Sequence, residues 1–218
     1  MVQENTKEGY ALKVRVKFAK EGAMKFIGHL DIMRYFQKAV KRANLDVAFS
    51  EGFSPHMIMS FASPLGVGIT STGEYFDMEL KSATTSSDMV KRLNDAMAEG
   101  MKILSIRQVE DGKASKAMSL VAAADYRLKF RETAKLPENW KEKLEEFKAQ
   151  KEIVILKKTK KSEKELDIRP FIYKLSLEEK DEIFMQLAAG SSNNTKPELV
   201  MEAFAAFMEI PYENLKNL

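Results

Sequence analysis

The sequence predicts an α+β protein with two ferredoxin-like halves in tandem and mostly antiparallel sheets. Two observations support this prediction. In the first half, segments that alternate apolar and polar residues and segments with helical periodicity follow one another in the order β-α-β-β-α-β, the ferredoxin-like arrangement. The second half follows a polar stretch and reads as β-α-β-β-β-α, a variant of the same plan. We therefore place the two halves at residues 1–118 and 119–218.

In the first half, the alternating segments expected to form strands are 12–19, 57–62, 73–80 and 101–109. Residues 29–43 have helical periodicity, with apolar residues on one face and cations on another. Ser87 can cap a second helix that runs to about Glu99, and Gly100 can end it.

In the second half, the expected strands are 121–130, 152–157 and 181–188, and residues 165–169 and 171–177 are expected to be extended and broken by Pro170. Pro137 fits the first turn of a helix that continues to about Ala149. Thr195 and Glu198 have the spacing of a capping box, which opens a last helix to about Met208.

The composition of the chain excludes several classes of functional site. The 218 residues are 44% hydrophobic and 31% charged, the balance of an ordinary globular protein. The chain has no cysteine, which excludes a disulfide framework, a thiolate zinc site and an iron–sulfur cluster held by this chain. We find no signal peptide or membrane-spanning stretch, and expect a cytoplasmic protein without a membrane partner or a cofactor of its own. The net charge of +3 is mild, with cations concentrated in residues 29–43 and 157–161.

The first candidate binding feature is the start of the predicted helix at residue 29. Gly28 permits close approach of a ligand to the backbone, and His29 falls at the helix N-terminus, where free N–H groups favour an anion. Arg34, Lys38 and Arg42 then follow at helical spacing. The alternative is that His29 only packs near the helix start and that the cations form a solvated face.

The second feature is the connector from Phe49 to His56. It holds Phe53, Pro55 and the second of the two histidines in the chain. Exposed aromatic residues in a loop suit stacking on a nucleobase. The alternative is that Phe49 and Phe53 are core residues that cover the edge of the sheet.

The third feature is a Gly- and Ser-rich link that starts at Ser60. Gly66 and Gly68, with hydroxyls on either side, could form a backbone cradle for an anion, or simply a bent connection between strands. Both histidines lie within this one segment of the chain, so we expect the histidines, the glycines beside them and the cationic edge of the helix to converge in one polar hollow. Asp31 and Glu74 could join the histidines around a metal ion, but no tight ligand spacing is present and we predict no metal.

The segment FIGHLDIMRYFQKAVKRANLDVAFSEGFSPHMIMSFASPLGVGITSTGEYFDMEL resembles the signature of the radical-SAM-linked domain family of bacterial proteins. That signature reads approximately F-x-G-H-L-D, a basic helix, G-F-x-P-H, F-A-x-P-L and S-x-x-E. A later string, LDIRPFI at Leu166–Ile172, is similar to the second-half motif of the family. The chain departs from the pattern at Met57, where the family often has proline, which leaves the turn geometry open there. The matching residues are Phe26, Gly28, His29, Leu30, Asp31, Arg34, Gly52, Phe53, Pro55, His56, Phe61, Ala62, Pro64, Leu65, Gly66, Gly68, Ser71 and Glu74.

This resemblance implies an accessory role beside a radical-SAM enzyme that is encoded separately, because the chain lacks a Cys-x3-Cys-x2-Cys motif. It also suggests RNA modification or ribosome metabolism. The leading hypothesis is a non-catalytic module that binds RNA, either tRNA or rRNA, or another anionic substrate at the His29/His56 region.

Two alternatives remain open. The first is a metal-independent endoribonuclease, by analogy with the tandem ferredoxin-like folds of CRISPR repeat-processing enzymes. His29 would be its general base, with Asp31 and Glu74 as the other acid/base groups. The second is a protein–protein adaptor that binds no RNA.

Overall fold

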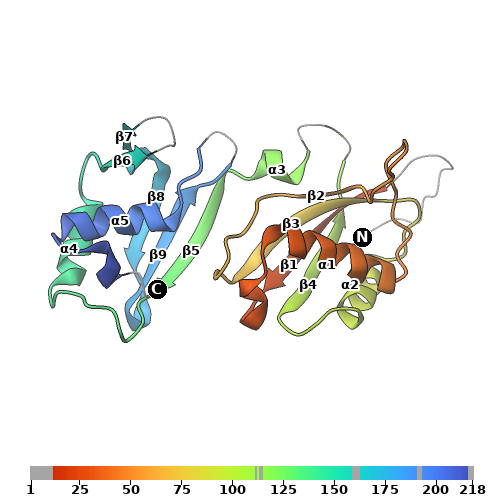
Figure 1. Ribbon diagram of the computed structural model, residues 1–218, viewed down its shortest axis with the longest axis horizontal. Helices are drawn as coiled ribbons and strands as arrows, with labels where there is room; N and C mark the ends of the chain where they lie inside the picture. The colour runs from red at the N-terminus through yellow and green to blue at the C-terminus, as the bar shows by residue number, and fades with distance from the viewer. Residues whose placement is uncertain (1–11, 111, 113–114, 159–162, 191–192, 216–218) are drawn as a thin grey trace. The chain divides into compact units, whose positions relative to one another are not determined.

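A computed structural model describes residues 12–110, 112, 115–158, 163–190 and 193–215. The chain divides into two compact units, Met1–Val121 and Ala122–Leu218, each with its own hydrophobic core. Figure 1 draws the elements of both units.

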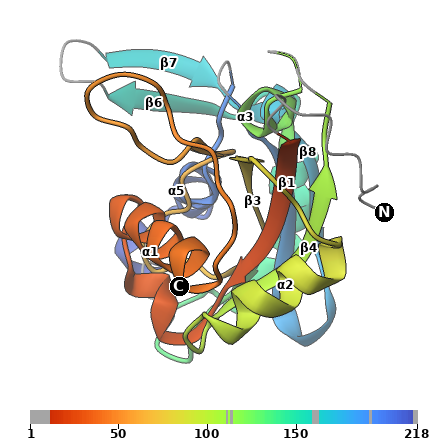
Figure 2. The same cartoon turned by 90° about the vertical axis from the view of Figure 1, so that its right-hand side faces the viewer.

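Unit 1 contains one four-stranded sheet. Its strands are β1 (Leu12–Lys20), β2 (Met59–Phe61), β3 (Ser71–Leu80) and β4 (Met101–Gln108). Their order is β2-β3-β1-β4, and every neighbouring pair is antiparallel. Helix α1 (His29–Arg42) links β1 to β2, and α2 (Ser86–Asp95) links β3 to β4; both pack on the same face of the sheet (Figure 2). The ferredoxin-like arrangement predicted for the first half is therefore confirmed.

Unit 2 is a variant of the same plan. Its main sheet has the order β5-β9-β8, which matches β1-β3-β2 of unit 1. A separate hairpin, β6–β7, is inserted after helix α4, and the described part of unit 2 has no counterpart of β4. The bounds are β5 (Ala123–Lys129), α4 (Trp140–Lys148), β6 (Val154–Lys158), β7 (Glu163–Asp167), β8 (Ile172–Leu177), β9 (Glu182–Ala188) and α5 (Pro197–Phe207).

Five short helices in the described part of the chain lie between or after the longer elements. They are η1 (Gly22–Phe26), α3 (Ala117–Leu120), η2 (Arg169–Phe171), η3 (Glu179–Asp181) and η4 (Tyr212–Asn214). Pro170 lies in η2, which separates two extended segments, and the predicted break at this proline is confirmed. These segments, β7 and β8, belong to different sheets. The α+β class and the mostly antiparallel pairing are confirmed.

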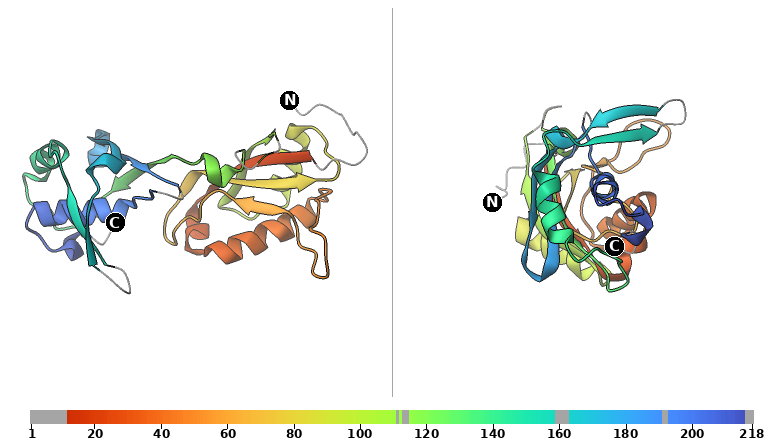
Figure 3. Two further views of the ribbon diagram at one scale, coloured as in Figure 1. Left: turned by 90° about the horizontal axis from the view of Figure 1, so that it is seen from above. Right: turned by 90° about the vertical axis from the view of Figure 1, so that its left-hand side faces the viewer.

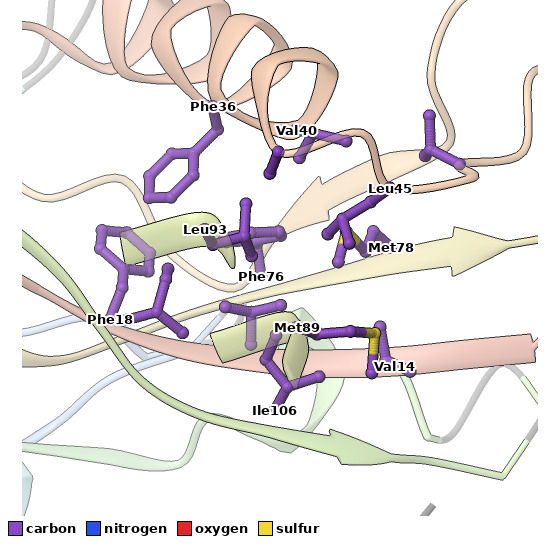
Figure 4. Close-up of a cluster of buried hydrophobic side chains, with 14 of the residues drawn as sticks. Val14, Phe18, Phe36, Val40, Leu45, Phe76, Met78, Met89, Leu93 and Ile106 are labelled. Atoms are coloured by element: carbon purple, nitrogen blue, oxygen red, sulfur yellow. The ribbon is translucent and has the colours of Figure 1, made fainter. Parts of the chain in front are cut away.

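The core of unit 1 lies between the two helices and the sheet (Figure 4). Phe36 of α1 meets Phe18 of β1 and Phe76 of β3, with ring centroids 4.7 and 4.8 Å apart. Full burial of one such side chain stabilises the fold by about 1.5–3 kcal/mol. Phe61, at the end of β2, extends this aromatic cluster to the end of the sheet where α1 begins. The core therefore fixes the N-terminus of α1 against the sheet.

The other face of the sheet carries a buried carboxylate. Phe76 and Met78 point toward the helices, so Asp77 between them points away. Asp77 is 4% exposed, and its Oδ1 accepts a 2.8 Å hydrogen bond from Arg15 Nε. Its Oδ2 accepts a 2.8 Å bond from the backbone N–H of Ala117, the first residue of α3. A buried charge thereby holds the last segment of unit 1 against β3.

Helix α2 begins and ends differently from the prediction. Thr85, rather than Ser87, is its N-cap, and the Thr85 hydroxyl accepts the N–H of Asp88. The helix ends at Asp95 instead of near Glu99. Gly100 lies just before β4 with a φ of +87°, and a Cβ there would stand 2.7 Å from the carbonyl oxygen of Glu21. Gly100 is thus required by a close backbone approach and not by the end of α2.

The predicted capping box of α5 does not form. The N-cap is Lys196, and no side chain accepts a hydrogen bond there. Thr195 is buried, and its backbone N–H donates to the carbonyl oxygen of Ala188 at the end of β9. Thr195 is thus buried against the sheet instead of capping α5, which is why the capping box does not form.

Candidate functional site

The N-terminus of α1 presents free backbone donors. Gly28 is the N-cap in an extended conformation, and no side chain caps the first turn. The carbonyl oxygen of Gly28 accepts the first intrahelical bond from Ile32, at 3.0 Å. The N–H groups of the first helical turn therefore have no intrahelical partner and carry the positive end of the helix dipole.

His29 packs against the aromatic core. Its imidazole is half-buried and meets Phe61 edge-on, with ring centroids 5.4 Å apart and planes at 90°. Asp31 in the same turn points to solvent and pairs with Arg34 at 3.2 Å. His29 thus packs on the end of β2 and stays partly exposed.

A buried lysine beneath this turn was missed by the sequence analysis. Lys20, the last residue of β1, is 2% exposed, and its Nζ donates a 2.8 Å hydrogen bond to the carbonyl oxygen of Ile27. Val14, Val16 and Phe18 alternate along β1 on the face toward the helices, and Lys20 continues that series. This alternation is a signal that could have identified Lys20 as buried.

Glu74 lies next to Lys20. It pairs with Phe18 in the β1–β3 register and lies on the helix-covered side of the sheet. Burial raises the pKa of the Glu74 carboxyl, although the Ser71 hydroxyl and the charge of Lys20 act against this. Burial likewise lowers the pKa of Lys20, and the charge of Glu74 opposes that shift. The structure thus brings His29, Lys20 and Glu74 to the same end of the sheet.

The glycine-rich link folds back onto η1. Gly68 has a φ of +90°, and its N–H donates a 2.8 Å hydrogen bond to the carbonyl oxygen of Lys25. This amide is therefore not free for an anion, and a Cβ on Gly66 would meet Ile69 at 3.1 Å. The expected backbone cradle is corrected accordingly: the link closes a loop over η1.

Exposed apolar side chains flank the start of α1. Phe26 of η1 is 66% exposed, and the ammonium of Lys25 lies 5.1 Å from the centroid of its ring. Leu30 in the first turn of α1 and Val67 next to Gly68 are exposed to a similar degree. Ser60 does not join them, because it pairs with Asp77 in the β2–β3 register and points to the opposite face of the sheet.

The cations of α1 separate into two groups. The guanidinium of Arg42 donates to the carbonyl oxygen of Ala96 at 2.8 and 3.3 Å, beyond the last turn of α2. Arg42 therefore caps α2, a role that the sequence did not indicate. Arg34, Lys38 and Lys41 are exposed along the outer side of α1, and we call these three the basic face. The other cationic run, residues 157–161, enters the described structure only as the last two residues of β6.

The connector between α1 and β2 forms a closed hairpin over residues 49–57. Phe49 pairs with Met57, and the N–H of Ser50 donates to the carbonyl oxygen of His56 at 2.9 Å. The Ser50 hydroxyl accepts the N–H of His56 at 3.1 Å and lies 2.8 Å from its Nδ1. His56 thus fastens the hairpin, and Phe53 projects from its tip fully exposed. Neither Phe49 nor Phe53 is a core residue.

The two histidines lie at opposite ends of unit 1. Val47, just before the hairpin, pairs with Leu80 at the end of β3, whereas His29 contacts Phe61, which pairs with Phe76 in the middle of β3. Helix α1 has 14 residues and spans about 21 Å between the two places (Figures 1 and 3). The expected single hollow does not form, because α1 carries the chain along the length of the sheet before β2 begins.

The LDIRP motif of unit 2 has a structural role. Asp167 Oδ1 accepts the N–H groups of Ile153 and Arg169, at 2.8 and 2.9 Å. The Arg169 guanidinium donates to the carbonyl oxygens of Gln150 and Ile172, both at 3.1 Å. The motif therefore ties the segment after α4 to the start of β8.

The described residues contain no group of three or more histidine, aspartate or glutamate side chains that could hold a metal ion. In the same part of the chain, no helix has the length and apolar character needed to cross a membrane.

A comparison with models of protein families shows to which family the chain belongs. A model described as "Uncharacterized protein conserved in bacteria (DUF2344)" matches residues 13–197. The chain belongs to this family. The DUF2344 match begins in β1 and ends at the first residue of α5, so it includes both the Gly28–His29 turn and the hairpin. A search of curated proteins found no match.

Proposed function

We propose that this chain is a non-catalytic accessory module that binds RNA and works in the cytoplasm beside a separately encoded radical-SAM enzyme. The observation that carries the proposal is the position of the basic face. Arg34, Lys38 and Lys41 follow one side of α1, which begins at an uncapped N-terminus beside the exposed Phe26.

Each part of this surface suits a different part of a single-stranded RNA. Lysine and arginine neutralise phosphates and release counterions, and a helix N-terminus with free N–H groups favours a phosphate. An exposed phenylalanine offers a stacking platform for a base, worth about 1–3 kcal/mol. The basic face would therefore bind the phosphates of the RNA, and Phe26 would stack on one of its bases.

The radical-SAM partner rests on the motif resemblance at Phe26–Asp31 and Gly52–His56. The chain has no cysteine and cannot itself supply thiolates to an iron–sulfur cluster. An enzyme that supplies the cluster would have to be a different chain, and this module would present tRNA or rRNA to it.

Fluorescence anisotropy with labelled total tRNA at about 50 mM salt tests RNA binding. We expect the wild-type chain to bind, and the double variant Lys38→Ala/Lys41→Ala to bind about tenfold more weakly, because two phosphate contacts are lost. The matched control is Lys102→Ala/Lys129→Ala, which removes two exposed lysines from β4 and β5. Absence of binding, or equal weakening in both double variants, would refute the proposal.

One observation favours a second candidate, the metal-independent endoribonuclease. Glu74, whose pKa burial raises, lies at the same end of the sheet as His29. A protonated carboxyl could act as general acid while His29 acts as general base. RNA cleavage in the presence of EDTA that is lost in both His29→Ala and Glu74→Gln would favour this candidate over the binding module.

A further inference from the structure

Hydrogen bonds hold the 49–57 hairpin in one conformation in the unbound chain. Besides the bonds between Ser50 and His56, its base is tied to the sheet. The N–H of Ala48 donates to the carbonyl oxygen of Glu79 at 2.8 Å, and the N–H of Lys81 donates to that of Asp46 at 2.7 Å. A loop fixed in this way loses little conformational entropy when it binds.

Its tip displays one large apolar side chain. Phe53 has a relative exposure of 109%, higher than that of any other exposed large hydrophobic residue in the described structure. Gly52 precedes it with a φ of +101°, a conformation that turns the chain at the tip. Phe49 at the base is 43% exposed and extends the apolar surface. Rigid aromatic anchors of this kind are typical of the few residues that dominate protein–protein interfaces.

The charge of the hairpin itself disfavours RNA. Residues 49–57 contain no lysine or arginine, and Glu51 is their one charged residue. Glu51 is exposed two residues from Phe53. A phosphate backbone would be repelled at this tip, whereas the basic face of α1 attracts it.

We propose that the 49–57 hairpin is a docking prong for a protein partner: Phe53 enters an apolar pocket on that partner, and Glu51 meets a lysine or arginine on the rim of the pocket. The prong lies beyond the C-terminal end of α1, whereas Phe26 and the uncapped N-terminus lie at the other end of the helix. This assignment replaces the base-stacking role that the sequence suggested for Phe53.

Site-specific photocrosslinking tests the prong. Benzoylphenylalanine is placed at position 53 of the full chain in cells, and the crosslinked species and its contact residues are identified by mass spectrometry. We expect a protein that is joined within an apolar pocket bordered by lysine or arginine. Crosslinks to RNA or to a second copy of this chain, or no crosslink, would overturn the proposal.

The crosslinked protein is then purified, and its affinity for the full chain is measured by calorimetry. We expect Phe53→Ala to weaken binding about 30-fold, since truncation of a central aromatic anchor costs about 2 kcal/mol. Glu51→Lys should weaken binding about tenfold by placing like charges together. Phe26→Ala is the matched control, because it removes an exposed phenylalanine from the other end of α1, and it should leave this affinity unchanged. Equal affinity of wild type and Phe53→Ala would contradict the proposal.

Discussion

Lys20 and Glu74 show how the environment of single residues defines the candidate site. A lysine and a glutamate lie close enough beneath the first turn of α1 for their charges to interact, and burial of each charge costs free energy unless it has hydrogen-bond partners. Lys20 has the carbonyl oxygen of Ile27, and Glu74 has the Ser71 hydroxyl. Each of the two ionisable groups under the uncapped N-terminus therefore has a hydrogen-bond partner of its own.

The pKa of Glu74 predicts a pH effect on stability. Its folded-state pKa is raised above the unfolded value of about 4.3. The folded protein thus binds the proton more tightly, and the free energy of unfolding should fall as pH rises from about 4.3 to the raised pKa. Glu74→Gln cannot ionise and should lack this fall. Urea unfolding of both proteins between pH 4 and 8 measures it, and parallel stability curves would contradict the assignment.

Several site residues could be read from the sequence, but their grouping could not. Helical periodicity placed His29 at a helix N-terminus and the cations on one side of α1, as the structure has them. Periodicity carries no information on which carbonyl a long side chain reaches, so the cap made by Arg42 was not foreseen. Proximity in sequence also suggested that His29 and His56 meet, although a whole helix separates them.

At the scale of elements, helix ends are the least predictable feature. Residues 84–88 offer four hydroxyls in a row before Asp88, and each of them can serve as an N-cap. The structure selects Thr85, because its hydroxyl reaches the N–H of Asp88. The long periodic segments, by contrast, were placed correctly, since an apolar face such as that of α1 requires burial.

The cap assignment can be checked by substitution. Thr85→Ala should lower the free energy of unfolding by about 1 kcal/mol, because one N–H of α2 loses its partner. Ser87→Ala should change it by only a few tenths of a kcal/mol, since Ser87 is exposed and lies inside the helix. Chemical denaturation of both variants provides the comparison. A larger loss in Ser87→Ala would show that the helix begins elsewhere.

For the whole chain, topology explains why two neighbouring motifs form two surfaces. The β-α-β order of unit 1 returns the chain along the sheet, so the GHLD turn and the GFSPH hairpin mark the two ends of α1 (Figure 3). The ferredoxin-like plan of unit 1 was predictable from alternating and helical patterns. The separate two-stranded sheet of β6 and β7 in unit 2 was not, because these strands have the same local pattern as strands of the main sheet.

The salt dependence of RNA binding tests the central claim, that the basic face of α1 meets the phosphates, most directly. The logarithm of the association constant for total tRNA is measured against the logarithm of the salt concentration, with the full chain and its variants. Each lost phosphate contact should reduce the steepness of this line by about 0.7, so Lys38→Ala/Lys41→Ala should reduce it by about 1.4. Lys102→Ala/Lys129→Ala should leave the slope unchanged. A slope that Lys38→Ala/Lys41→Ala does not alter would contradict the account.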